Sequence, residues 1–374
     1  DGGERIWIHI ADPSRWVSPD HPLELEARKR GTSVYLPEQV IPMFPRDLTT
    51  GPMSLVQGEV RCALSFGIRL HGDGSIAETL IQPSLIKVTY RLTYEDADEM
   101  LELGAERELT ALAAAAQTRY QWRLGRGAIS INLPEQDIKV IDEVPHLRVI
   151  EDTPARQLVA ELMVLTGEAV ATYARDHEIP FLYRFQMDPD LPPPDLLAQL
   201  PPGPVRDFAL IRCMPRAEMT TTTSGHAGLA LDAYSQVTSP IRRYADLVAH
   251  RQLKAHLAGD PLPYSLDDLR QVITGLDPIT YEAVQVERKR KRYWTLEFLK
   301  LQTQQVWRSL ILGFLREHEN LALVMLDEIA FRCPVRFERQ IQPGEWVDLE
   351  LLKVDPRTDG VEWREHSSQG AAVS

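Results

Sequence analysis

The chain has 374 residues, of which 44% are hydrophobic and 25% are charged, as in a folded protein with a sizeable core. The formal net charge of −13 argues against a protein that coats nucleic acid by bulk attraction, but it leaves room for a locally basic channel. Three widely spaced cysteines without CxxC spacing argue against a zinc site or a disulfide framework. No apolar run approaches bilayer length and no secretory signal opens the chain, so we expect a cytoplasmic protein without a membrane partner.

The first residues, Asp1-Gly2-Gly3, precede a strand-like run at 6–10. Asp-Gly is a hairpin signal that needs a strand before it, and the chain does not begin with methionine. We interpret the chain as the middle of a longer polypeptide. Asp12, at the end of the strand before Pro13, fits a structural carboxylate better than a metal ligand.

Further elements follow from apolar periodicity and from turn residues. Strands are predicted at 61–70 and 75–82, joined by the turn at 71–74, with a third strand at 85–92. Helices are predicted to start within the acidic segment 94–99, over 105–123, from Pro154, and over 265–275 and 279–305. Short strand-length segments over 306–366 predict a small five-stranded barrel, and the tail 367–374 is expected to be disordered.

Residues 220–254 concentrate hydrogen-bond donors before an apolar helical pattern. Ser239 is a predicted cap and Pro240 a predicted first helical residue. Thr238, Ser239, the free amides, Arg242 and Arg243 would then gather at one helix start, an arrangement that binds phosphate. The alternative is that Arg242 forms an ordinary ion pair with Asp246, four residues further on.

This stretch, GHAGLALDAYSQVTSPIRRYADLVAHRQL (225–253), resembles the signature of the RNB family of exoribonucleases, which includes ribonucleases II and R. The segments HIADPSRWV (9–17), RGTSVYLPEQVIPMFPRDL (30–48), IPFLYR (179–184) and the pair Glu287-Arg288 are similar to the same family, in the same order. The resemblance covers residues 6 to about 300. It implies an α+β protein with an RNB catalytic domain at 1–305 and an S1-like OB-fold domain at 306–366. The segment 127–131 resembles a strand of the family. Two positions depart from the family pattern: Ile131, in that segment, stands for a phenylalanine and Gly167 for an asparagine.

The resemblance implies processive 3′→5′ hydrolysis of single-stranded RNA to nucleoside monophosphates. Arg242 would be catalytic, steadying charge on the phosphorus, and Tyr35 would stack on the terminal base. The other implied RNA-binding residues are Glu161, His226, Tyr234, Thr238, Ser239, Arg243 and Arg288. Two Mg²⁺ ions, or Mn²⁺, would be held by aspartates upstream of Asp1, so no metal ligand is assigned in this chain. We expect a monomer; the alternative function is a catalytically inactive RNB-like RNA-binding protein.

Overall fold

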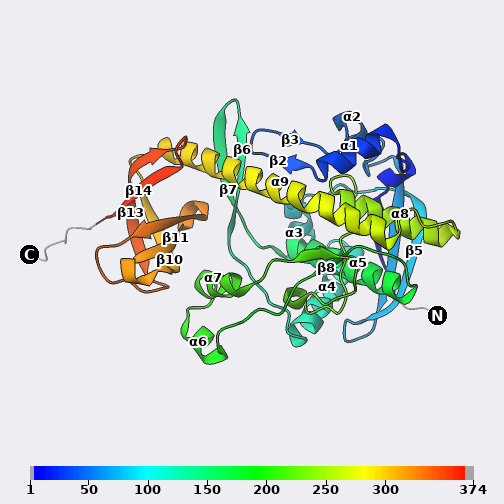
Figure 1. Ribbon diagram of the computed structural model, residues 1–374. Coiled ribbons are helices and arrows are strands. Elements are labelled where there is room, and N and C mark those ends of the chain that lie inside the picture. Colours follow the sequence, from blue (N-terminus) through cyan, green and yellow to red (C-terminus); the bar gives the residue numbers. More distant parts are fainter. Residues whose placement is uncertain (1–3, 367–374) are drawn as a thin grey trace, which may run out of the picture.

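The computed structural model describes residues 4–366, which combine helices with antiparallel sheets as the expected α+β class requires (Figure 1). The main helices are α1 (Pro22–Arg30), α3 (Tyr94–Leu103), α4 (Arg107–Gly125), α5 (Pro154–Asp176), α8 (Tyr244–Ala258) and α9 (Leu266–Lys300). Shorter helices are α2 (Arg46–Thr49), α6 (Pro194–Gln199) and α7 (Pro204–Cys213), with single 3₁₀ turns at Pro13–Arg15, Ala227–Leu229, Glu317–Glu319 and Asp327–Ile329. None of the helices within residues 4–366 has the length and apolar character needed to span a membrane.

A three-stranded sheet forms the N-terminal part of the core. Its strand order is β1 (Ile6–Ala11), β4 (Val60–Leu70) and β5 (Ile76–Lys87). The predicted turn at 71–74 joins β4 to β5, with the His71 amide donating to the Ser75 carbonyl. The predicted separate strand at 85–92 is wrong, because Leu85 continues β5 and pairs with Cys62.

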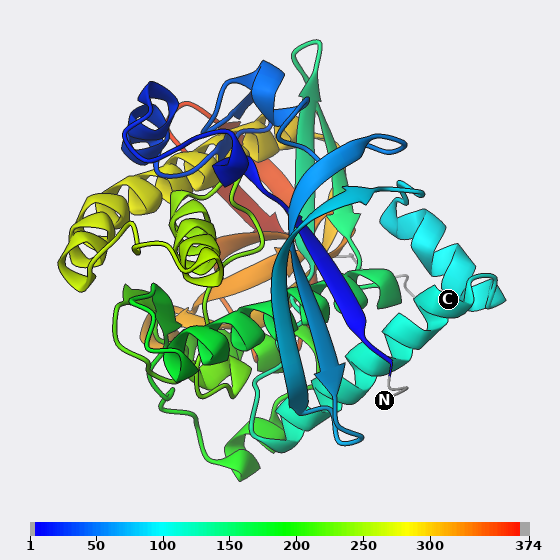
Figure 2. The same cartoon turned by 90° about the vertical axis from the view of Figure 1, so that its right-hand side faces the viewer.

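Helices α4 and α5 pack behind this sheet, as Figure 2 shows. Buried side chains from the strands and from α5 form one apolar cluster, which includes Ile8, Phe66, Leu165 and Val170. The predicted helix starts near Tyr94 and at Pro154 are confirmed, and Thr93 caps α3 through a reciprocal capping box.

Helix α9 is continuous over 35 residues, whereas two helices were predicted at 265–275 and 279–305. Pro278 lies inside it and removes one backbone hydrogen bond, at a typical cost of roughly 3 kcal/mol. Leu269, Val272 and Leu276 are buried against α1 and α8, so tertiary packing offsets that cost. Figure 1 shows α9 extending from this core to the C-terminal sheet.

The hairpin of β6 (Glu135–Ile141) and β7 (Val144–Ile150) was not predicted, and the predicted strand at 127–131 is a loop. The two-residue turn between β6 and β7 consists of Asp142 and Glu143, which adopt φ values of 50° and 64°. Such a turn is signalled in sequences by Asn-Gly or Asp-Gly, and Asp-Glu carries no such signal. Smaller pairs are β2 (Val34–Tyr35) with β3 (Val40–Ile41), and β8 (Tyr183–Phe185) with β9 (Glu218–Thr220).

Residues 306–366 form a curled five-stranded antiparallel sheet. Its order is β12 (Phe331–Arg336), β11 (Leu321–Leu326), β10 (Val306–Arg316), β13 (Trp346–Asp355) and β14 (Gly360–Glu365). No ladder joins β12 to β14 within the described chain, so the sheet is open there. Phe331 and Phe337 are buried in its core. The domain boundary at 305 stays a prediction, and the tail 367–374 lies outside the described residues.

Candidate functional site

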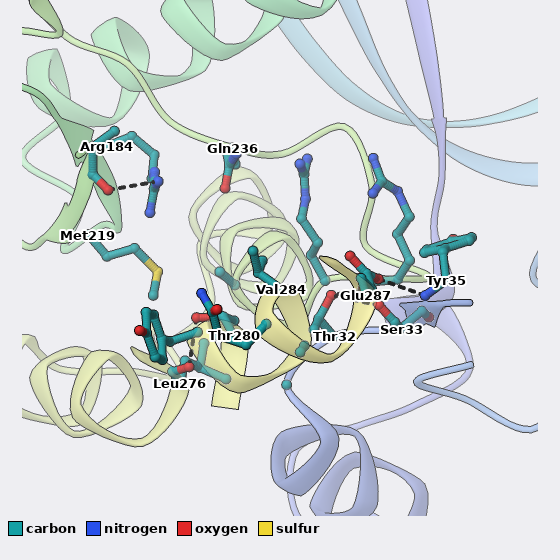
Figure 3. A pocket seen from close by; sticks show the side chains of 18 of the residues that line it. Thr32, Ser33, Tyr35, Arg184, Met219, Gln236, Leu276, Thr280, Val284 and Glu287 are labelled. Atoms are coloured by element: carbon teal, nitrogen blue, oxygen red, sulfur yellow. Dashed lines mark hydrogen bonds between the residues drawn. The ribbon is translucent and has the colours of Figure 1, made fainter. Parts of the chain in front are cut away.

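A cavity of about 530 Å³ lies between the segment 31–35, the turn at 239–243 and helix α9 (Figure 3). Its walls carry five arginines and a single carboxylate. The arginines are Arg184, Arg216, Arg242, Arg243 and Arg288, and the carboxylate is Glu287. The site is therefore locally basic, although the whole chain is acidic. Such a cavity suits an anionic ligand.

The turn that carries Arg242 differs from the predicted helix start. Helix α8 begins at Tyr244, so Ser239 is not its cap and Pro240 is not its first residue. The Ser239 amide donates to Asp246 Oδ2 at 2.8 Å, and the Tyr244 amide donates to the Gly31 carbonyl at 2.9 Å. The Ser239 amide, and the Arg242 amide that donates to the Ser239 carbonyl at 3.1 Å, are thus already bonded within the protein, which corrects the helix-start model of anion binding.

Arg243, and not Arg242, forms the ion pair with Asp246. Its Nε donates to Asp246 Oδ1 at 2.9 Å and its Nη2 to Oδ2 at 2.6 Å, while Nη2 also reaches the Thr238 hydroxyl at 3.4 Å. The buried Asp246 carboxylate thereby holds the turn. The predicted alternative, an Arg242–Asp246 pair, is wrong. Arg243, three residues before Asp246, forms the ion pair with that carboxylate instead.

The guanidinium of Arg242 is exposed to the cavity and has no side-chain partner among residues 4–366. Its backbone is fixed instead, because the Arg242 carbonyl accepts from the Ser33 amide at 2.9 Å and from the Thr32 hydroxyl at 3.1 Å. A rigid backbone with an unpaired guanidinium presents a cation to an incoming anion at little reorganisation cost.

Tyr35 lies in the same cavity and its side chain is 48% exposed. Its amide donates to Glu287 Oε1 at 2.6 Å, so helix α9 anchors the tyrosine segment (Figure 3). Arg288, the next residue on α9, is exposed and has no ion-pair partner within the described chain. An exposed ring beside free cations is the composition of a single-strand nucleic-acid site.

A second groove of about 630 Å³ shares Tyr35, Glu287 and Arg288 with the first. It continues along β6 and is also lined by Lys291. The basic run on α9 therefore divides. Arg290 pairs with Glu38 and Arg292 with Asp359, whereas Arg288 and Lys291 face the grooves.

His226 and Tyr234 lie outside the lining of the main cavity and contact each other edge to face, with ring centroids 5.5 Å apart. Burial, with the nearby charge of Arg184, lowers the pKa of His226 to about 4. Gly167 of α5 explains how this loop docks. A Cβ there would lie 2.3 Å from the Tyr234 ring and 2.5 Å from the Ser235 carbonyl, so only glycine fits.

Glu161 is placed elsewhere, between α4 and α5, and is only 4% exposed. Arg123 grips it through Nε at 2.9 Å from Oε1 and through Nη2 at 2.5 Å from Oε2, and Arg119 lies 3.8 Å away. It borders a separate cavity of about 420 Å³ that also contains Ile131. The RNA contact expected of Glu161 stays a prediction, and its carboxylate is already engaged within the protein.

The cavity residues that sequence reasoning missed include Arg184 on β8, Arg216 before β9 and Tyr281 on α9. Arg184 belongs to the IPFLYR segment, but no motif tied it to Arg216, 32 positions later. Only the pairing of β8 with β9 brings them together.

The cavity does not fit a divalent cation. Such ions need several oxygen ligands, and the one carboxylate, Glu287, already accepts the Tyr35 amide among surrounding arginines. Across residues 4–366 there is no group of three or more His, Cys, Asp or Glu side chains that could hold a metal. Asp12 is buried and pairs with Lys254 at 2.6 Å, which fits its predicted structural role.

Comparisons with known sequences identify the relatives of this chain. A family model described as the RNB domain matches residues 1–200 and 193–259. An uncharacterized ribonuclease of Synechocystis is 50% identical over 368 residues, covering 98% of this chain and 55% of that protein. The chloroplastic/mitochondrial ribonuclease II of Arabidopsis thaliana is 38% identical, covering 98% of this chain and 46% of that protein. The chain thus spans about half the length of these relatives.

Solved structures share the fold. Mycoplasma genitalium RNase R, in complex with ribose-methylated single-stranded RNA, superposes with a TM-score of 0.85 at 20% identity, covering 97% of this chain and 67% of that one. Yeast Ssd1, described as a pseudonuclease, superposes with a TM-score of 0.73 at 20% identity, covering 96% of this chain and 48% of that one. The fold alone therefore accommodates both descriptions.

Proposed function

This chain belongs to the RNB family, and from that premise we propose that it is part of a 3′→5′ exoribonuclease that hydrolyses single-stranded RNA processively to nucleoside monophosphates. The observation that carries the proposal is the cavity in which the free guanidinium of Arg242, the exposed ring of Tyr35 and the free Arg288 meet. Residues 306–366 would be an S1-like RNA grip. Cytoplasmic location and a monomeric state stay predictions from the sequence.

In this function Arg242 donates to the phosphate oxygens at the link to be broken, an interaction that strengthens as negative charge builds there. Tyr35 stacks on a base near the 3′ end, which is worth roughly 1–3 kcal/mol and is indifferent to base identity. Arg288 and Lys291 neutralise phosphates along the adjoining groove.

Dependence on Mg²⁺ or Mn²⁺ is part of the proposal, but the cavity residues are not its ligands. The residues of this chain are assigned binding, stacking and stabilisation of charge, and no step is assigned to a metal. The metal-binding carboxylates would be supplied from outside the described cavity.

The test replaces Arg242 by glutamine in the intact protein that contains this chain. Turnover of single-stranded RNA should fall about 10²–10³-fold, as on removal of one donor to a developing oxyanion. RNA affinity should change much less, because Arg288 and Lys291 remain. Arg270→Gln, an exposed arginine at the start of α9, is the matched control. If Arg242→Gln weakened affinity and left turnover unchanged, the assigned role would be wrong.

The competing hypothesis is an RNB-like protein that binds RNA without cutting it. The fold likeness to a protein described as a pseudonuclease keeps this alternative in view. Release of nucleoside monophosphates from the 3′ end by the intact protein, abolished by a chelator, would exclude it. RNA binding with no release in the presence of Mg²⁺ or Mn²⁺ would establish it.

A further inference from the structure

The main cavity has a second cationic end, away from Tyr35. Arg184 and Tyr35 lie on opposite sides of it in Figure 3. Arg184 and Arg216 line this second end together with Met219, Leu276 and Tyr281. We call these five residues the Arg184 end of the cavity.

Neither arginine of the Arg184 end has a carboxylate partner. Arg184 Nη2 donates to the Ala217 carbonyl at 3.1 Å, and Arg216 lies 5.5 Å from the centre of the Tyr281 ring. No acidic oxygen comes within 4 Å of either guanidinium in the described part of the chain. In the same cavity Arg243 is neutralised by Asp246, whereas this end, like the end at Arg242, has no counter-charge of its own.

Arg184 is half-buried and has no carboxylate within ion-pair distance in the described chain. Burial lowers the pKa of the half-buried Arg184; the charge of Asp277 opposes the shift, and Arg216 and Arg243 add to it. A desolvated cation gains most from a charge-assisted, forked contact to an oxyanion such as phosphate. The missing negative charge is therefore best supplied by a ligand.

The remaining surface of this end suits a flat, partly polar group. Met219, Leu276 and the exposed ring of Tyr281 offer apolar contact, and Gln236 projects into the cavity without a side-chain partner in residues 4–366 (Figure 3). A phosphate anchored by two arginines would leave a base against the apolar residues and within reach of an amide. These features together describe a nucleotide site.

We propose that the Arg184 end binds a nucleoside 5′-monophosphate, with its phosphate between Arg184 and Arg216 and its base against Met219, Leu276 and Tyr281. The inference rests on the proposed function, because this ligand is the product of 3′→5′ hydrolysis. The product would then occupy a position distinct from the link at Arg242, and its accumulation would slow the next turnover by occupying the shared cavity.

The experiment measures binding of AMP, adenosine and inorganic phosphate to the 374-residue chain by titration calorimetry. We expect Arg184→Gln and Arg216→Gln each to weaken AMP binding at least about tenfold, since each removes a charge-assisted contact. Arg270→Gln should leave AMP affinity unchanged. Adenosine and inorganic phosphate should each bind more weakly than AMP. Because Arg216 is exposed, its replacement tests the site without disturbing the core.

Several outcomes would overturn the site. These are equal AMP affinity in all variants, AMP affinity that depends on Arg242 alone, and inorganic phosphate binding as tightly as AMP. Single-stranded RNA is titrated against the same preparations to separate this inference from the proposed function. If the chain binds RNA but its AMP affinity does not depend on Arg184 and Arg216, only the nucleotide site is disproved. If the unsubstituted chain binds neither RNA nor AMP, the proposed function is disproved as well.

Discussion

Two sets of arginines in this protein differ in their partners. Between α4 and α5, Arg123 is held by Glu161, and Arg119 pairs with Glu168. In the main cavity Arg184, Arg216 and Arg242 have no carboxylate within ion-pair distance among the described residues. The comparison shows that an arginine in a cavity indicates a ligand only when the protein does not supply its counter-charge. The first set stabilises the fold, and the second is free to bind.

The largest expected change in the free energy of unfolding comes from breaking an ion pair of the first set, between Arg123 and Glu161. Glu161→Gln would leave Arg123 without its carboxylate in a buried site, and removing one partner of a buried pair typically costs about 3–5 kcal/mol. We expect urea-induced unfolding to show a loss of this size. Glu282→Gln, on the exposed face of α9, is the control and should change stability by less than about 0.5 kcal/mol. If the Glu161→Gln variant were as stable as the parent but bound RNA more weakly, Glu161 would contact RNA and would not act mainly in stabilising the fold.

A smaller loss of folding stability is expected when the pH is lowered, because His226 has a depressed pKa. His226 is half-buried and has a pKa of about 4, so the unfolded state binds its proton first as the pH falls below about 6.5. The stabilising contribution of His226 is complete above that pH and is lost as the pH falls toward 4. Between pH 7 and pH 5 we expect it to decrease by about 1 kcal/mol, because solvent screening at this half-buried ring reduces the effect of the full shift.

The measurement compares the free energy of unfolding of the parent chain with that of His226→Gln at each pH. Glutamine does not titrate, so the difference between the two proteins isolates His226 from other acid-sensitive groups such as His9, whose pKa burial also lowers. A difference that stays constant from pH 7 to pH 5 would contradict the assigned burial of the neutral ring.

The smallest expected effect on stability comes from replacing an arginine that has no ion pair, such as Arg288. Arg288→Gln should change stability by less than about 0.5 kcal/mol, because its guanidinium is exposed and has no ion pair to lose. It should instead reduce the slope of log affinity for single-stranded RNA against log salt by about 1. Arg270→Gln should leave that slope unchanged. A marked loss of stability in Arg288→Gln would mean that the two sets are not distinct.

Local patterns predicted most of the regular elements. The turn at 71–74 and the start of α5 each carry their own signal in adjacent residues. The β6–β7 hairpin turns through Asp142 and Glu143 in left-handed conformations, for which neither residue is a signal. Helix α9 passes through Pro278 because packing on both sides outweighs local propensity.

The candidate site was predictable only in part, because its composition depends on tertiary contacts. Arg242 and Tyr35 were found through motifs, and the structure places both in one cavity. The competition between Arg242 and Arg243 for Asp246 is decided by side-chain geometry, which spacing alone does not reveal. Arg184 and Arg216 became neighbours only through the pairing of β8 with β9.

Helix α9 has a mechanical consequence. Its 35 residues form a rod of about 50 Å. One end is embedded beside α1 and α8, and Leu296 and Leu299 at the other end are built into the core of the C-terminal sheet. Midway, Glu287 holds the segment that bears Tyr35. Helix α9 thus fixes the distance between the C-terminal sheet and Tyr35. An RNA strand bound at the sheet would therefore reach the Tyr35 ring after a fixed length.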